Sequence, residues 1–337
     1  MYKMKPILCV NIGKLRLKNP VIVASGTFGY ADEFKGFVDL KKIGGIVSKT
    51  ITLSPRKGNP PPRTCETPAG MLNSIGLENP GVEVFIKEKL PILKKIGVPV
   101  IVSIASEGDP REFVALAKQL DKIKDIVAIE LNISCPNVVS RLASQPVNQL
   151  ASEPVNQLAG LIGTPANRHT GTLISQDSSS TYALVKAVRK VTKKTLITKL
   201  SPNVTDITEI AMAAEKAGSD AVSLINTLIG MSIDAETKRP KLAVITGGLS
   251  GPAIKPIALR MVWEVYQKVK IPIIGMGGIM DTQDAREFFL AGATAIAVGT
   301  ANFVNPRVSI EIIEGIKKYL RENKIKDIKT FIGGLKL

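Results

Sequence analysis

The chain has 337 residues, of which 45% are hydrophobic and 4% aromatic, and its formal net charge is +16 at pH 7. Its length permits one large α/β barrel or two smaller domains, and no apolar run reaches the roughly 18 residues that a membrane-spanning helix needs. Three scattered cysteines, Cys9, Cys65 and Cys135, argue against a disulfide framework or a zinc site, so we expect a reducing, cytoplasmic location with no membrane attachment.

The positive charge admits two interpretations. A nucleic-acid partner would select a dense basic patch with interleaved aromatic side chains. No dense basic run occurs here, and lysines are spread along expected helix faces at Lys35, Lys41, Lys42, Lys87, Lys89, Lys94 and Lys95. We therefore expect a Lys-rich surface and no nucleic-acid partner.

Eight β-rich runs, most of them followed by a helical pattern, span the chain. The expected strands are 21–25, 45–49, 98–104, 126–134, 196–200, 221–226, 271–275 and 295–299. The expected helices are near 31–42, 80–96, 110–124, 180–193, 206–217, 255–269, 281–291 and 306–323. This alternation predicts a parallel sheet with right-handed crossovers. Eight units favour a closed (β/α)8 TIM barrel, so 1–337 is expected to be one α/β domain.

Local signals mark several helix ends. Asp109 and Asp281 precede expected helices and are typical N-caps, whereas Gly97, Gly218 and Gly292 are typical C-terminal stops. These signals support the helix assignments independently of the hydrophobic pattern.

Two segments interrupt the alternation. Residues 51–79, after the second strand, are rich in Pro and Gly and predict an ordered excursion over the barrel mouth. Residues 138–178, after the fourth strand, are rich in Ser, Gln, Asn and Thr and contain two octamers, 142–149 and 150–157, that differ at one position. We interpret this second segment as a flexible tandem insertion; the alternative is a functional lid.

The residues that follow the expected strands are mainly amides, hydroxyls, lysines and glycines. In a barrel of this type, that edge carries the chemistry. Carboxylates are few, and the single histidine, His169, lies in the low-complexity segment. A catalytic divalent metal and a Ser-His-Asp triad are therefore not expected, and we predict no metal ligands.

Glycine clusters at 275–279 and 299–301 follow strands seven and eight. Backbone N–H groups of such clusters can close around a phosphate, although each cluster alone could be a tight turn. Lys49 and Lys199 end two other strands, where each either meets an anion or extends to solvent. Two such lysines at one mouth would suit a flavin, because charge near the ring tunes its chemistry.

Cys135 lies in the segment Asn132-Ile133-Ser134-Cys135-Pro136-Asn137, directly after strand four. Pro136 ends the strand, which places the thiol in a loop at the mouth, and nearby lysines would favour the thiolate. A buried structural thiol is the alternative. Asn73, Asn132, Asn137 and Asn226 could pair with a planar ligand carrying amides and carbonyls, although any one of them could be a turn or cap residue.

Several motifs together resemble the dihydroorotate dehydrogenase family. They are 132–137, Asn73-Ser74-Ile75-Gly76-Leu77, Ile225-Asn226-Thr227 and the run 246–253. The stretches 58–63 and 66–71 are similar to the class 1B, NAD-linked branch. The likeness covers nearly the whole chain except about 138–178.

The resemblance implies an FMN-binding barrel that oxidises (S)-dihydroorotate to orotate in de novo pyrimidine (UMP) biosynthesis. It implies that Cys135 removes the C5 proton while hydride passes from C6 to the flavin. The implied substrate residues are Lys49, Asn73, Ser74, Ile75, Gly76, Leu77, Asn132, Asn137, Asn226 and Thr227. The implied FMN residues are Ser25, Gly26, Lys49, Thr50, Ser103, Asn132, Lys199, Ile225, Gly251, Gly277, Gly278, Gly299 and Thr300. Members often carry Asn where this chain has Ser103.

The class 1B resemblance also implies partners. Such enzymes are heterotetramers with a homodimer of catalytic subunits and two electron-transfer subunits that carry FAD and a 2Fe-2S cluster, and NAD+ is the final acceptor. This chain lacks the cysteines for such a cluster, so a partner would supply it. The repeat insertion follows the Cys-Pro-Asn segment. Since the closure entropy of a loop grows only slowly with its length, we expect a folded, FMN-bound protein that retains activity.

Two other functions compete with this interpretation. A tRNA dihydrouridine synthase is also an FMN barrel with Cys-Pro after strand four, and the charge of +16 would suit tRNA. Such enzymes carry a C-terminal helical RNA-binding domain, for which the residues after the last expected helix are too few. The second rival is a non-catalytic, basic RNA-binding barrel.

Overall fold

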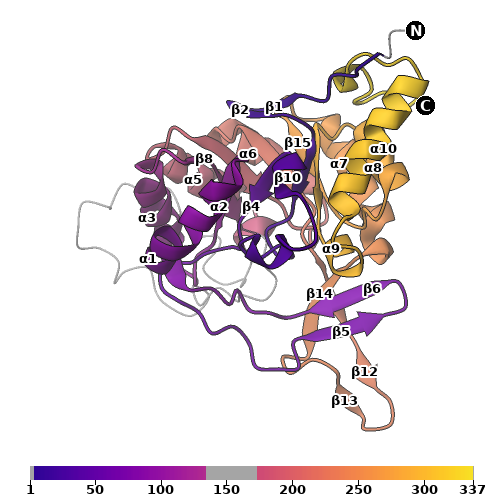
Figure 1. Cartoon of the computed structure of the whole chain (residues 1–337). Coiled ribbons are helices and arrows are strands. Elements are labelled where there is room, and N and C mark those ends of the chain that lie inside the picture. The colour runs from indigo at the N-terminus through magenta and orange to yellow at the C-terminus, as the bar shows by residue number, and fades with distance from the viewer. Residues whose placement is uncertain (1–3, 134–172, 337) are drawn as a thin grey trace.

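The computed structural model describes residues 4–133 and 173–336, and its central element is a closed barrel of eight parallel strands (Figure 1). The strands neighbour one another in the order β10-β15-β16-β3-β4-β7-β8-β9. Their bounds are β3 Val21–Val23, β4 Gly45–Val47, β7 Val100–Ile104, β8 Ile126–Asn132, β9 Thr195–Lys199, β10 Ala221–Leu224, β15 Ile273–Gly275 and β16 Ala295–Val298. All eight predicted strands are thus confirmed, and each begins and ends within a few residues of its predicted bounds.

Helices cover the outside of the barrel (Figure 1). They are α1 Gly81–Val84, the π-turn η3 Phe85–Lys89, α2 Leu90–Ile96, α3 Pro110–Asp121, α5 Ser178–Arg189, α6 Ile207–Ala217, α7 Lys255–Tyr266, α8 Thr282–Leu290, α9 Ala301–Val304 and α10 Val308–Glu322. The predicted caps are confirmed: the Asp109 and Asp281 side chains accept hydrogen bonds from N–H groups of the first helical turn, and Gly97 and Gly218 are left-handed C-caps.

Two sequence assignments need correction. The helix expected at 31–42 is two separate 3-10 turns, η1 Asp32–Phe34 and η2 Leu40–Lys42, because Gly36 lies between them and the Asp39 side chain caps a new turn by accepting from the Lys41 N–H. Residues 173–178, expected to belong to the insertion, form the 3-10 turn η7 Ile174–Gln176 and the start of α5. The rest of the expected insertion lies outside the described residues.

Four strands outside the barrel form an antiparallel sheet over its mouth in the order β11-β14-β6-β5. They are β5 Thr64–Thr67, β6 Gly70–Asn73, β11 Leu228–Met231 and β14 Thr246–Ser250. The Pro- and Gly-rich excursion provides β5 and β6, whereas β11 and β14 come from the loop after β10. The hairpin of β12 Ile233–Asp234 and β13 Arg239–Pro240 projects beyond this sheet (Figure 1).

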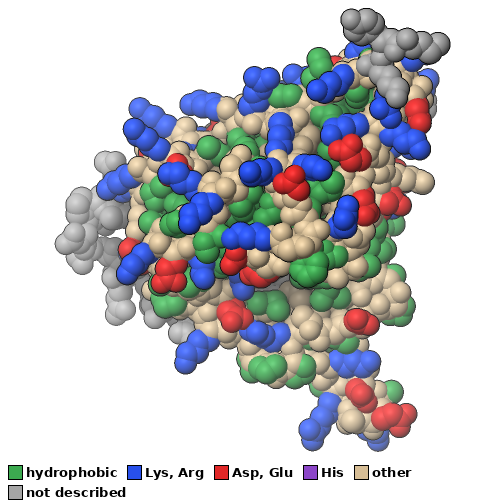
Figure 2. All heavy atoms as spheres, viewed as in Figure 1, with side chains coloured by type: hydrophobic (Ala, Val, Ile, Leu, Met, Phe, Trp, Pro, Cys, Tyr) green, Lys and Arg blue, Asp and Glu red, His purple; other side chains and the backbone are tan. Residues whose placement is uncertain are grey.

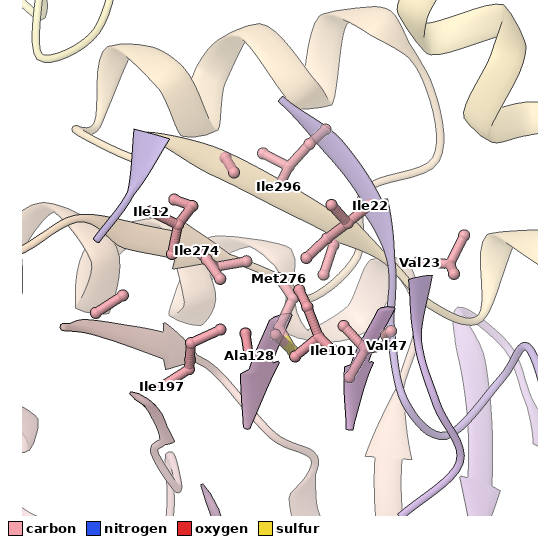
Figure 3. Packing of buried hydrophobic residues seen from close by; sticks show 14 of the residues in the cluster. Ile12, Ile22, Val23, Val47, Ile101, Ala128, Ile197, Ile274, Met276 and Ile296 are labelled. Atoms are coloured by element: carbon pink, nitrogen blue, oxygen red, sulfur yellow. The ribbon is translucent and has the colours of Figure 1, made fainter. Parts of the chain in front are cut away.

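A second hairpin, β1 Val10–Ile12 and β2 Leu15–Leu17, covers the opposite end of the barrel. At its turn, Gly13 lies against Asp220 and Thr195, at the amino ends of two barrel strands. Ile12 is fully buried and joins the barrel core (Figure 3). The barrel is therefore closed at this end and open only at the carboxyl ends of its strands.

The lower barrel is filled by aliphatic side chains, whereas its upper part is polar. Ile22, Ile101, Ile197 and Ile274 face the barrel interior towards the amino ends of the strands (Figure 3). Above them, Ser103, Glu130, Lys199 and Ser223 are also buried. Polar groups withdrawn from water need partners, and this layer lies directly beneath the barrel mouth.

Lys and Arg side chains are spread over the face seen in Figure 2, with acidic side chains among them. Several lie in short-range pairs, such as Lys35 with Asp32 and Arg260 with Glu264.

In the part of the chain that the structure describes, no helix is both long and apolar enough to cross a membrane.

Candidate functional site

A cavity of about 420 Å3 opens at the carboxyl ends of the barrel strands, and the described candidate residues gather on its wall. Its volume lies within the range of small-molecule sites. The predicted cofactor residues on the wall are Ser25, Gly26, Lys49, Thr50, Asn132, Lys199, Ile225, Gly251, Gly277, Gly278, Gly299 and Thr300. The predicted substrate residues on the wall are Lys49, Asn73, Ile75, Gly76, Leu77, Asn132, Asn226 and Thr227.

Glycines form one side of the cavity. Gly251, Gly277 and Gly278 all have positive φ angles. A Cβ atom on Gly278 would lie 2.7 Å from the Lys255 Cβ and 2.9 Å from the Gly251 carbonyl oxygen, so the chain segments could not approach this closely with a larger residue. Thr300 adds a hydroxyl that donates to the Ser250 Oγ at 2.8 Å. This backbone-lined cradle fits a phosphate group.

The barrel floor carries a short hydrogen-bond network. The Asn132 Nδ2 donates to the Thr50 Oγ1 at 3.1 Å, and the Thr50 and Ser103 hydroxyls are hydrogen-bonded at 2.9 Å. Ser103 is fully buried and does not line the cavity. It therefore lies behind Thr50, and its predicted contact with a cofactor stays a prediction.

Lys199 crosses the barrel interior. Its Nζ donates to the Ser25 Oγ at 3.3 Å, just after β3, the strand opposite β9 in the barrel, and its side chain is almost completely buried. Lys199 thus points inward across the cavity floor and does not extend to solvent. Of the two alternatives for this lysine, extension to solvent is therefore wrong.

The predicted substrate residues lie on the other side of the cavity, around the four-stranded sheet. The Asn73 Nδ2 donates to the Gly248 carbonyl at 3.3 Å, which ties β6 to β14. The Thr227 N–H donates to the Asn226 Oδ1 at 2.9 Å. Ser74 does not line the cavity, and its buried hydroxyl has no hydrogen-bond partner among the described residues.

Among the described residues of the wall, the cations are Lys49, Lys199 and Arg63, and Glu78 is the carboxylate. Glu78 is already engaged, because Arg63 Nη1 lies 2.6 Å from its Oε2. The remaining field is positive and suits an anionic ligand. Behind the glycine cradle, a hydrogen bond to Asp284 at 2.6 Å raises the pKa of Lys255, which keeps that lysine charged.

The predicted site residues did not include Thr27, Arg63 or Ser250, although Thr27 follows the first barrel strand and Arg63 and Ser250 lie in the stretches that resemble the family. The Thr27 Oγ1 is buried on the cavity wall without a hydrogen-bond partner among the described residues, as expected of a hydroxyl that contacts a ligand. Thr27 and Ser250 each adjoin a predicted residue in the sequence. This adjacency was the signal in the sequence that could have identified both residues as part of the site.

Two predicted site residues, Cys135 and Asn137, lie outside the described residues. Strand β8 ends at Asn132, which lies on the cavity wall. Of the cysteines that the structure describes, Cys9 contacts Arg16 near the closed end of the barrel, and Cys65 lies on β5. Neither of them lines the cavity.

A sequence profile described as Dihydroorotate dehydrogenase matches residues 7–320. A protein of Trichlorobacter lovleyi named dihydroorotate dehydrogenase B (NAD(+)), catalytic subunit, is 51% identical over 332 residues, covering 98% of this chain and 99% of the relative. Proteins of the same name from Bacteroides thetaiotaomicron and Geotalea uraniireducens are 50% and 49% identical, again over 98% of this chain and 99% of each relative.

Proposed function

The chain belongs to the dihydroorotate dehydrogenase family, and from this premise we propose that it is a catalytic subunit that oxidises dihydroorotate to orotate in pyrimidine biosynthesis. The observation that carries the proposal is that one cavity, at the carboxyl ends of the strands, brings the predicted residues together. Residues predicted for substrate and residues predicted for a flavin meet on its wall, from segments spread between Ser25 and Thr300.

The family is flavin-dependent, and we propose FMN as the flavin of this chain. The glycine cradle with Thr300 would hold the phosphate, and Lys199 would face the ring from the cavity floor. The unpartnered hydroxyl of Thr27 provides a further hydrogen bond for the same ligand. When bound, the flavin supplies the two-electron acceptor for the hydride at C6 of the substrate.

The chain's own residues would bind and orient the substrate. Lys49 provides a cation for the substrate carboxylate, and the amides of Asn73, Asn132 and Asn226 can donate to ring carbonyls or accept from ring N–H groups. Since Asn73 is tied to β14 and Asn132 to Thr50, these amides are held in place before substrate binds.

We propose Cys135 as the base that accepts the C5 proton. The support is its position in the sequence, as the third residue after Asn132, in a chain whose single histidine lies in the low-complexity segment. A thiol in a positively charged environment is favoured as thiolate and can take a proton. Asn137 would act on the substrate from the same loop.

The relatives are named catalytic subunits, which supports a partner subunit for this chain. We propose that the partner carries FAD and a 2Fe-2S cluster and passes electrons to NAD+, and that two copies of this chain form the core of the assembly. The cytoplasmic location and the absence of a nucleic-acid partner stay predictions.

The test is anaerobic bleaching of the bound flavin by dihydroorotate. The wild-type protein should bleach rapidly, and Cys135→Ala should bleach about 10²–10⁴-fold more slowly while still binding flavin. Cys65→Ala, a thiol on β5 away from the cavity wall, is the matched control and should match the wild type. A wild-type flavoprotein that dihydroorotate cannot reduce would contradict the function, whereas normal bleaching of Cys135→Ala would remove only the assigned base.

A further inference from the structure

Glu130 is a buried carboxylate in the barrel to which the proposed reaction gives no role. It lies on β8 with only 2% of its surface exposed. It shares the inward-facing side of the strand with Asn132, two residues later, which lines the cavity. Its Oε1 has no hydrogen-bond partner among the described residues. A carboxylate withdrawn from water in this way is costly unless a positive charge compensates it.

The position of the Glu130 carboxylate follows from its hydrogen bond to Ser223. The Ser223 Oγ donates to the Glu130 Oε2 at 3.0 Å. Glu130 is on β8 and Ser223 on β10, and β9 lies between these two strands. The register pairs Ser223 with Lys199 of β9. Glu130 itself is paired in register with Ile197, so its side chain crosses the inner face of β9 from the level of Ile197 towards the level of Lys199.

Lys199 is the cation that complements this anion. It is 5% exposed, and no carboxylate lies within ion-pair distance of its Nζ in the described part of the chain. Its ammonium donates to Ser25 across the barrel, above the level of Glu130. The two opposite charges are thus both buried in the upper barrel without an ion pair between them, and each reduces the cost of burying the other.

We propose that Glu130 is a positioning residue for the flavin site: its carboxylate is the counter-charge that holds Lys199 in place and balances the positive charge presented to the flavin ring. This inference rests on the proposed function, because it needs a flavin above Lys199. Removal of the negative charge leaves the Lys199 ammonium unbalanced. An unbalanced cation beneath the ring favours the reduced, more negative flavin.

The experiment compares the midpoint potential of the bound flavin in the wild type and in Glu130→Gln, which keeps the shape and an acceptor for Ser223 but removes the charge. We expect Glu130→Gln to raise the equilibrium constant for flavin reduction about tenfold, or about 30 mV for two electrons. Ser223→Ala removes the hydrogen bond and keeps the charge, and its equilibrium constant should stay within about threefold of the wild type. An unchanged potential in Glu130→Gln, or an equal shift in Ser223→Ala, would overturn the inference.

A double-mutant cycle with Lys199→Gln tests whether Glu130 acts through Lys199. In the Lys199→Gln background, Glu130→Gln should change the equilibrium constant by less than about threefold, because the cation it balances is gone. An undiminished shift would show that Glu130 does not act through Lys199. If Glu130→Gln alone fails to fold, recovery of folded protein in the double variant supports the pairing, and failure of both contradicts it.

The wild type in the same experiment distinguishes failure of the proposed function from failure of the role of Glu130. A wild-type protein without flavin would overturn both the proposed function and the role of Glu130. A wild type that dihydroorotate reduces, with a Glu130→Gln potential equal to its own, would overturn the role of Glu130 alone.

Discussion

Replacement of Gly278 by alanine tests the glycine cradle. Gly278 has a φ of +73°, and an added Cβ would lie 2.7–2.9 Å from Lys255 and from the Gly251 carbonyl. The left-handed backbone costs an alanine about 1–2 kcal/mol, and forcing a methyl group against packed atoms costs about 1–3 kcal/mol more. The neighbouring backbone must move to relieve the clash, and it is the same backbone that would face the phosphate.

Gly97→Ala is the matched control. Gly97 has a φ of +75°, nearly that of Gly278, but nothing lies within 4 Å of its added Cβ, and it caps α2 on the outside of the barrel. Its unfolding free energy should fall by only about 1–2 kcal/mol, the cost of placing an alanine in the left-handed backbone conformation. The difference between the two variants therefore isolates the effect of the clash in the cradle.

The assay is titration of each apoprotein with FMN, followed by flavin fluorescence, together with urea unfolding. Loss of one charge-assisted hydrogen bond to the phosphate, about 1.5–3 kcal/mol, would weaken FMN binding about 10–100-fold in Gly278→Ala. Gly97→Ala should bind FMN as the wild type does. If Gly278→Ala bound FMN within about threefold of the wild type, Gly278 would not belong to a phosphate site.

Two further predictions concern stability and the insertion. The Asp206 side chain caps α6 by accepting from the Thr208 N–H at 2.8 Å, and the hydrogen bonds with Thr208 lower its pKa. Asp206→Ala should therefore lose about 1 kcal/mol of unfolding free energy at pH 7. This gap should shrink as the pH falls below about 4, where the carboxylate becomes protonated. Asp206→Asn, a neutral cap, should show little of this pH dependence, and a gap that persists at low pH would exclude the carboxylate as its cause. Replacement of residues 139–172 by a short Gly-Ser linker leaves η7 intact and should preserve FMN binding and orotate formation, because the closure entropy of a loop depends weakly on its length; loss of FMN binding would show that the segment is structural.

The barrel was predictable because its strands are short runs of β-branched residues, such as Ile126–Asn132, separated by helices with recognisable caps. Local signals sufficed there, since each strand pairs with strands nearby in the chain or closes the ring. The helix expected at 31–42 was wrong because its hydrophobic pattern ignored the break at Gly36.

The antiparallel sheet over the mouth was not predicted. β6 and β14 are short and contain Gly70, Gly247 and Gly248, which weakens any strand pattern. Their pairing joins Asn73 to Gly248, residues separated by 175 positions. The predicted site residues were recognisable as motifs, but their assembly into one cavity depends on this distant pairing. Glu130 was not predicted as a functional residue either, because it lies within an apolar strand and its partner Ser223 is 93 positions away.

The pairing of β6 with β14 also has a consequence for biosynthesis. β6 follows the second barrel strand and β14 the sixth, so a nascent chain must extend past Ser250 before the two can meet. Asn73 donates a hydrogen bond to the Gly248 carbonyl, and the Thr227 side chain packs against Gly248. Neither residue can therefore reach its final position before Gly248 has been synthesised. A polypeptide still in synthesis therefore cannot bind the ligand, and a ribosome stalled before β14 would carry six of the eight barrel strands without a site for dihydroorotate.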